Sequence, residues 1–192
     1  MARALIVHAS RHGATAGIAE RIGETLRREG IDAVVEPASH GPDPFGFDAC
    51  IVGSGVYMGS WLKDGTDYLE RYEATLSALP VWLFSCGPLP GSTKATTSPD
   101  PIEQALGPAE GPGSGGRRKV EALADAIAVR GHEVFLGAYD PKDPPKAISE
   151  RLVRMFVGGK GLLPPGDFRE WDRIDAWAGE LARAVREPVP VA

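Results

Sequence analysis

The amino-acid sequence predicts an α/β fold in which helices cover both faces of a doubly wound, parallel, five-stranded sheet. Short apolar runs of the kind that form strands buried on both faces alternate with segments of helical periodicity. Parallel strands need crossover helices, so this alternation favours a sheet between two helical layers. The length of 192 residues predicts a single domain over residues 1–192. The five predicted strands are Ala4–Val7, Ile31–Glu36, Ala49–Ser54, Val81–Cys86 and Glu133–Tyr139.

Apolar residues at helical spacing follow these strands, and capping residues mark where the helices begin. The first helix is expected to begin near Thr15 and to end at Gly30. Ser60 is expected to cap the second helix, and Glu170 to complete a capping box near Asp167, where the last helix begins. The other two predicted helices are Arg117–Arg130 and Ile148–Val157.

A stretch rich in Gly, Pro and Ser interrupts this alternation from residue 88 to 116. A structureless segment of this length is uncommon inside a domain, and is usually a lid, a binding loop or disordered. We therefore expect a long loop over residues 88–116, with Ile102 and Leu106 as its apolar anchors.

Composition and charge limit the classes of function. The net charge of -5 gives no support to nucleic-acid binding, which usually needs a basic patch. Neither a signal peptide nor an apolar run as long as a membrane span is expected, so the predicted location is the cytoplasm. Cys50 and Cys86 lie in apolar runs, which favours buried thiols in a reducing compartment over a disulfide.

A polar turn with one glycine connects the first strand to the first helix. Such a turn directs backbone N–H groups and the positive end of the helix dipole to one point, where an anion can bind. The hydroxyls of Ser10 and Thr15 flank this point and can donate to a phosphate oxygen, and Thr15 is also expected to cap the helix. The turn therefore predicts a phosphate site; the alternative is an ordinary strand–helix connection. Its residues are Ser10, Arg11, His12, Gly13, Ala14 and Thr15.

Two more turns with glycine follow the third and fourth strands. Because the carboxyl ends of parallel strands share one edge of the sheet, we expect all three turns to line one ligand site. Tyr57 is expected either to form a flat wall for a ring or to pack on its own loop, and Trp61 competes for the same role. The residues of these turns are Gly55, Val56, Tyr57, Met58 and Gly59, and then Cys86, Gly87 and Pro88.

The first turn resembles the phosphate loop of the flavodoxin-like proteins, which carries a Thr/Ser-x-Thr-x/Gly-x-Thr pattern. Ser10, Gly13 and Thr15 match this pattern, whereas His12 replaces its middle threonine. The fingerprints of NAD and ATP sites are absent from this turn. The resemblance implies a flavodoxin-like three-layer sandwich with strand order 2-1-3-4-5 and non-covalent FMN. The first turn would then bind the phosphate, and the other two turns the ring.

With FMN as the cofactor, the flavin is expected to be the only reacting group, so that no catalytic side chain and no metal site are predicted. The four histidines are scattered, and the two cysteines lack metal-ligand spacing. Hydrogen bonds to the ring are expected from backbone N–H groups of Val56–Gly59 and of Gly87.

Three segments are similar to a narrower group, the menaquinone-dependent protoporphyrinogen oxidase-like flavoproteins. They are Ser54–Tyr57, Leu152–Gly159 and the closing segment Asp167–Trp177. The resemblance implies an FMN-dependent, quinone-linked dehydrogenase whose donor is a tetrapyrrole or another bulky reductant. The stretch Ile148–Leu163 is expected either to contact a membrane surface peripherally or to form a core helix with solvated arginines.

Three other functions stay open. A flavodoxin-like electron carrier would dock a redox protein through acidic residues, which the net charge permits. The run Arg11–Thr15 also looks like the Arg-His-Gly-x-Thr motif of histidine phosphatases, but His132, the candidate second histidine, is expected to precede a strand. The fold can also serve as an interaction module without catalysis.

Overall fold

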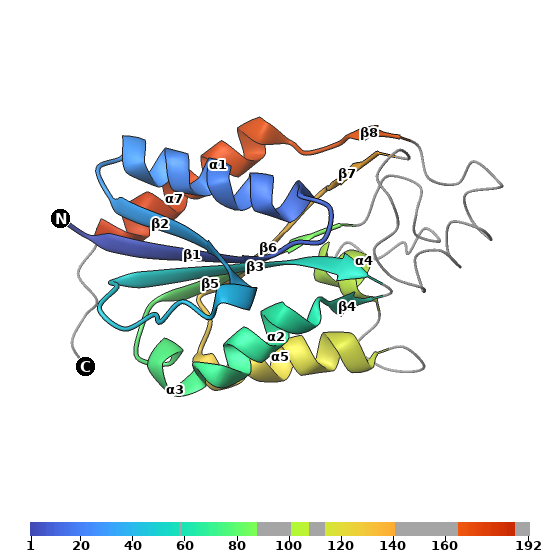
Figure 1. The fold of residues 1–192 in the computed structure, drawn as a ribbon, viewed down its shortest axis with the longest axis horizontal. Coiled ribbons are helices and arrows are strands. Elements are labelled where there is room, and N and C mark those ends of the chain that lie inside the picture. Colours follow the sequence, from blue (N-terminus) through green and yellow to red (C-terminus); the bar gives the residue numbers. More distant parts are fainter. Residues whose placement is uncertain (58, 88–100, 108–113, 141–164, 187–192) are drawn as a thin grey trace.

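A parallel β-sheet forms the middle layer of the structure, a computed structural model that describes residues 1–57, 59–87, 101–107, 114–140 and 165–186 (Figure 1). The helices α1 (Ala14–Arg28) and α7 (Trp171–Arg186) cover one face of this sheet. The helices α2 (Lys63–Arg71), α3 (Glu73–Leu76) and α5 (Gly115–Ile127) cover the other face. The predicted arrangement of helices on both faces is confirmed.

The order of the long strands is β2-β1-β3-β5-β6, and all their pairings are parallel. Counted in chain order without the two-residue β4, this is the predicted order 2-1-3-4-5, so the fold prediction is confirmed. The long strands are β1 (Arg3–Ala9), β2 (Asp32–Pro37), β3 (Ala49–Tyr57), β5 (Val81–Cys86) and β6 (Gly131–Phe135).

The core lies on both faces of the sheet because its central strands are apolar throughout. Every residue of β5 is buried, and the inner faces of α1 and α7 close over one side of the sheet. On α1 this face consists of Ile18, Ile22 and Leu26, as the periodicity predicts. The two cysteines, Cys50 and Cys86, are buried free thiols, which confirms the preference over a disulfide.

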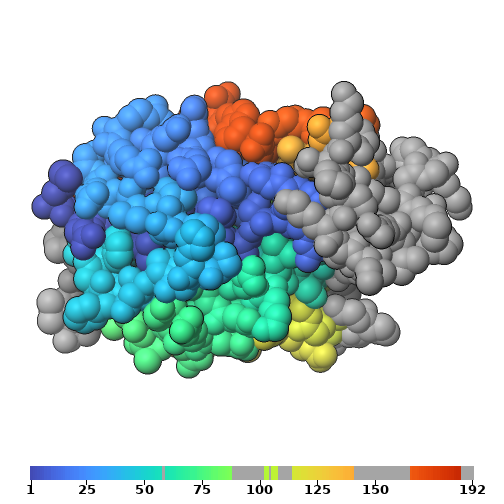
Figure 2. Space-filling view, in the orientation of Figure 1, coloured from blue at the N-terminus to red at the C-terminus, as the bar shows by residue number. Residues whose placement is uncertain are grey.

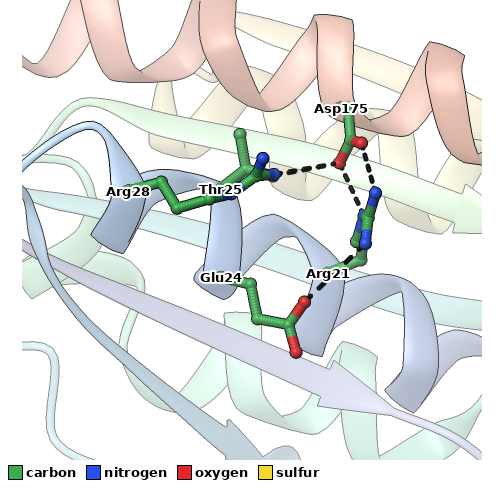
Figure 3. A network of polar contacts seen from close by, with 5 residues as sticks. All are labelled: Arg21, Glu24, Thr25, Arg28 and Asp175. Atoms are coloured by element: carbon green, nitrogen blue, oxygen red, sulfur yellow. Dashed lines mark hydrogen bonds and ion pairs between the residues drawn. The ribbon is translucent and has the colours of Figure 1, made fainter.

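An ion-pair network joins α1 to α7, two helices that lie far apart in sequence (Figure 3). The Nε and Nη2 atoms of Arg21 donate to the carboxylate of Asp175, at 2.7 and 2.6 Å, and the Thr25 hydroxyl donates to the same carboxylate at 3.0 Å. The Arg21 guanidinium therefore holds the pKa of Asp175 below its usual range. In Figure 2, α1 (blue) and residues 165–186 (orange-red) lie side by side on one surface of the molecule.

Several predicted boundaries are wrong because short tertiary pairings override local periodicity. Ser60 does not cap a helix; it begins β4 (Ser60–Trp61), which pairs antiparallel with the end of β3, and α2 starts after Leu62. The predicted helix from Ser60 to Pro80 is interrupted at Tyr72, between α2 and α3. A short 3₁₀ helix, η1 (Ala38–His40), follows β2.

The C-terminal part differs from the prediction in a similar way. The predicted strand Glu133–Tyr139 divides into β6 and a two-residue strand, β7 (Ala138–Tyr139). Asp167 belongs to β8 (Gly166–Asp167), which pairs with β7, so α7 begins only at Trp171.

The long loop predicted over residues 88–116 contains two helical segments. The helix α4 (Pro101–Leu106) lies within it, and α5 begins at Gly115 rather than Arg117. The rest of this loop and the predicted helix Ile148–Val157 lie outside the described residues. Of the helices in the described ranges, none is long and apolar enough to span a membrane.

Candidate functional site

The ends of β1, β3 and β5 lie at one edge of the sheet, on the right in Figure 1. This edge brings together the described residues of the three turns that the sequence singles out. Side-chain and backbone contacts hold these turns close to one another. Met58 and Pro88 lie outside the described residues.

The first turn ends at Gly13, which is the N-cap of α1 and has a left-handed backbone with φ of 88°. Such a conformation favours glycine. The Gly13 N–H donates to the Ser10 hydroxyl at 3.1 Å, so the hydroxyl keeps its own proton for donation. Within the helix, the first backbone bond runs from Gly17 N–H to the Gly13 carbonyl at 2.9 Å. The N–H groups of residues 14–16 therefore have no acceptor within the helix.

Thr15 does not cap α1, which is a correction to the prediction. It lies inside the helix, its side chain is 3% exposed, and α1 has no side-chain cap. Its hydroxyl is turned inward, toward the Cys86 thiol at the end of β5. Burial raises the pKa of the Cys86 thiol to about 11, although the bond with Thr15 and the charge of Arg169 act in the opposite direction. Cys86 is thus a neutral thiol at neutral pH.

Thr15 also connects the first turn to the second. A Cβ atom on Gly55 would lie 3.2 Å from the Thr15 hydroxyl oxygen and 3.3 Å from the Tyr57 ring, closer than nearly all real Cβ contacts. The absence of a side chain at Gly55 therefore allows the start of α1 to approach the end of β3 closely. Thr15 contacts the second and third turns at once, which the sequence did not predict.

The second turn is the tip of a hairpin, because β3 continues to Tyr57 and β4 pairs back along it. The Arg11 guanidinium carbon lies 4.6 Å from the Tyr57 ring centroid, within the range of a cation–π contact. The His12 ring lies 6.5 Å from the same ring, at an angle of 47°. Tyr57 thus packs on the first turn, and the assignment of Arg11 and His12 to the ligand site stays a prediction.

The third turn begins with Gly87, whose φ of 124° favours glycine. Its N–H donates to the Phe135 carbonyl at 2.9 Å, so the expectation that this N–H is free for a ligand is wrong. A Cβ atom on Gly87 would lie 3.6 Å from the Val56 carbonyl oxygen. The third turn therefore lies against the second.

Trp61 does not compete with Tyr57 for a ligand-facing position, because it is 5% exposed and its indole N–H donates to the Ser85 hydroxyl at 2.8 Å. The Ser85 hydroxyl also lies 2.9 Å from His132 Nε2. The expectation that His132 precedes a strand is wrong: it is the second residue of β6. Its ring lies edge-on to Trp61 at 5.8 Å, under the hairpin rather than in the first turn.

The segment 165–171 also reaches this edge, although no site residue was predicted there from the sequence. The Phe168 N–H donates to the Gly137 carbonyl at 3.1 Å, and β8 pairs with β7 just beyond the end of β6. Arg169 then lies against the first turn of α1, at Gly17. In the sequence, Arg169 lies in the run Asp-Phe-Arg-Glu-Trp, whose acidic and aromatic residues could mark a functional segment. This local pattern does not predict that the segment packs against α1.

The first turn fits a phosphate group. It offers the N–H groups of residues 14–16 and the Ser10 hydroxyl as donors. The first helical turn of α1 carries no acidic residue that would repel a phosphate. In the described part of the chain, no group of three or more His, Cys, Asp or Glu side chains is arranged to hold a metal ion.

Comparisons with known proteins agree with this geometry. The model of the flavodoxin domain matches residues 5–109. The structure is similar to a mutant of Pseudomonas aeruginosa flavodoxin, with a TM-score of 0.56, 16% identity and coverage of 96% of this chain and 99% of that one. It is also similar to a short-chain flavodoxin associated with a non-canonical PDU bacterial microcompartment. The TM-score is 0.57 and the identity 14%, with coverage of 96% of this chain and 99% of that one.

A third similar structure is larger than this chain. Rubredoxin oxygen:oxidoreductase from Desulfovibrio gigas gives a TM-score of 0.54 and 12% identity over 96% of this chain, but only 36% of that protein is covered. The similarity to these structures shows the fold, and the domain match covers more than half of the chain. The chain therefore belongs to the flavodoxin domain family, whose cofactor FMN these turns fit.

Proposed function

We propose that this protein is an FMN-dependent oxidoreductase that works as a single flavodoxin-like domain over residues 1–192. The observation that carries the proposal is the contact among three turns at one sheet edge. Thr15 of the first turn lies against Gly55 of the second and is hydrogen-bonded to Cys86 of the third. A ligand that spans these turns is bound by residues from three strands, which is what an elongated cofactor with a charged end and a flat end requires.

The first turn is proposed to hold the phosphate through the N–H groups of residues 14–16 and the Ser10 hydroxyl. The second and third turns, Gly55–Gly59 and Cys86–Pro88, are proposed to hold the ring. When bound, FMN supplies the redox chemistry. The chain binds the cofactor, orients its ring and tunes its reduction potential through nearby dipoles.

The position of the ring is tested at Tyr57. We expect Tyr57→Ala to weaken FMN binding about tenfold and to shift the reduction potential, because a stacking wall is lost. Tyr72→Ala is the matched control: its hydroxyl donates to the Gly41 carbonyl, away from the three turns. Flavin released by denaturation identifies the cofactor. Release of FAD, or of no flavin, would overturn the proposal, and an unchanged affinity and potential in Tyr57→Ala would overturn the position of the ring.

The reaction is proposed to be a quinone-linked dehydrogenation of the protoporphyrinogen oxidase type. The support is the resemblance of Ser54–Tyr57 and Asp167–Trp177 to that group; the first segment lies on β3 at the site, and the second begins at the same sheet edge. The third segment of the resemblance, Leu152–Gly159, lies outside the described residues, as does the proposed membrane-contacting stretch Ile148–Leu163. A tetrapyrrole or another bulky reductant is the proposed donor.

The second candidate is an electron carrier that docks a redox protein, which the net charge of -5 permits. Reduced protein mixed with a menaquinone analogue, or with a redox protein, separates the two. Rapid reoxidation by the quinone supports the dehydrogenase. Rapid reoxidation by the protein partner alone would overturn it and support the carrier. In both cases the proposed location is the cytoplasm. For the quinone-linked dehydrogenase, peripheral contact with the cytoplasmic face of a membrane is also proposed.

A further inference from the structure

Arg169 reaches the first turn of α1 from a part of the chain more than 150 residues away. The pairing of β8 with β7 and the bond from Phe168 N–H to the Gly137 carbonyl hold its backbone at the sheet edge. Its Nη1 atom occupies the space where a side chain on Gly17 would begin. Gly17 is the fourth residue of α1, so the guanidinium lies beside the helix end where the phosphate is proposed to bind.

The guanidinium of Arg169 is held in one orientation. Its Nε and Nη2 atoms donate to the two carboxylate oxygens of Asp167 at 2.8 and 2.6 Å, and its central carbon lies 4.4 Å from the Trp171 ring centroid. The side chain is only 18% exposed, whereas that of Asp167 is 44% exposed. A bidentate pair uses one edge of a guanidinium and leaves the Nη1 edge for another acceptor. Among the described residues, no acceptor bonds to Nη1.

The positive charges gathered at this helix end favour binding of a further anion. The N-terminus of a helix carries a partial positive charge, so a cation beside it is repelled. The first turn of α1 contains no acidic residue, and Arg11 adds a second guanidinium to the preceding turn. The carboxylate of Asp167 offsets the charge on the far edge of Arg169 and is itself partly exposed to solvent. A phosphate dianion would satisfy the helix end and the guanidinium together.

We propose that Arg169 is a phosphate-binding residue of the FMN site, which supplies its Nη1 edge to the group that the α1 N-terminus holds. This inference rests on the proposed function. Arg169 lies beyond residues 5–109, the part that matches the flavodoxin domain. In this view the Asp167 carboxylate and the Trp171 ring position Arg169, and Gly17 leaves room for it.

The test compares FMN with riboflavin, which has the same ring and no phosphate. In Arg169→Gln we expect the FMN affinity of the apoprotein to fall about tenfold or more, since a charge-assisted hydrogen bond to the phosphate is lost. Riboflavin affinity is expected to stay within about twofold, because its ring contacts are retained. The preference for FMN over riboflavin should also depend less on ionic strength in Arg169→Gln than in the wild type.

Arg21→Gln is the matched control, because it also removes a bidentate Arg–Asp pair beside α1, the pair with Asp175 that joins α1 to α7 farther along the helix. It should lower thermal stability and leave the preference for FMN unchanged. A second variant, Gly17→Ala, keeps the charge of Arg169 but displaces its guanidinium, and alanine favours helix more than glycine, so folding is retained. It should weaken FMN binding and spare riboflavin binding.

The outcomes test the role of Arg169 separately from the proposal that FMN is the cofactor. Loss of FMN affinity alone in Arg169→Gln and Gly17→Ala supports the inference, and if Arg169→Gln does not fold, Gly17→Ala alone decides. Equal losses for FMN and riboflavin, or an unchanged preference for FMN, overturn the role of Arg169 but leave FMN as the cofactor. A wild-type protein that binds no FMN overturns the proposed function and the inference with it.

Discussion

A glycine in the centre of the sheet allows us to make a quantitative test of the core. Gly53 of β3 pairs with Phe84 of β5, and three ring atoms of Phe84 occupy the space of a Gly53 side chain, all within 3.0 Å of its ideal Cβ position. Phe84 is fully buried, and its ring lies 6.2 Å from Phe135 and 6.3 Å from Trp177. A methyl group at position 53 therefore has to displace a buried ring that is packed against two other aromatic rings.

We expect Gly53→Ala to destabilise the protein by about 3 kcal/mol, at the upper end of the usual cost of overpacking. Phe84→Leu removes the three ring atoms that conflict and should cost about 1.5 kcal/mol alone. In the double variant the methyl group partly fills the space that the ring leaves. We therefore expect a total loss of about 2 kcal/mol rather than the additive value of about 4.5 kcal/mol.

Urea unfolding of the four apoproteins, followed by far-UV circular dichroism, measures these free energies if the denaturant slopes agree. Phe135→Leu is the control background: it shortens a neighbouring aromatic residue, so Gly53→Ala should cost nearly as much there as in the wild type. If the costs of Gly53→Ala and Phe84→Leu add within about 0.5 kcal/mol, the steric reasoning is refuted.

Two further predictions concern titration and thiol chemistry. Because the Arg21 hydrogen bond lowers the pKa of Asp175 in the folded state, Asp175→Asn should cost up to about 1 kcal/mol at pH 7. This difference should disappear as pH falls through the lowered pKa, so equal costs in urea unfolding at pH 7 and pH 2.5 would contradict it. Burial raises the pKa of Cys50 to about 12 and that of Cys86 to about 11, so neither thiol should react with iodoacetamide at pH 8 until urea unfolds the chain. Stoichiometric labelling of the native protein would show that one of them is accessible.

The sheet could be predicted from the sequence because each long strand is an apolar run between helices. Ala4–Val7 and Val81–Cys86 contain almost no polar residue, since both faces of these strands are covered. Parallel pairing and the position of the turns follow from that alternation. The short elements could not be predicted, because β4, β7 and β8 each have two residues and depend on partners distant in sequence or on a hairpin.

The candidate site was predictable only in part, for the same reason. A turn after a strand can be recognised locally, and so the three turns were placed at one edge. The direction of a side chain depends on tertiary partners. Thr15 matches a capping threonine by its position, but its hydroxyl turns inward to Cys86, which is 71 positions later in the chain. Arg169 shows the same limit, because no local pattern places it beside Gly17.

The packing of α7 on α1 has a consequence for how the chain is made. Before residues 171–186 emerge from the ribosome, the nascent polypeptide contains every long strand but lacks α7, one of the two helices that cover the half of the core with Phe84 and Phe135. Contacts between such distant segments form slowly, and an uncovered apolar surface favours aggregation in the meantime. Translation that stops within α7 thus leaves part of one apolar face of the sheet exposed to solvent. Such truncated products should be substrates for chaperones and proteases rather than partly active proteins.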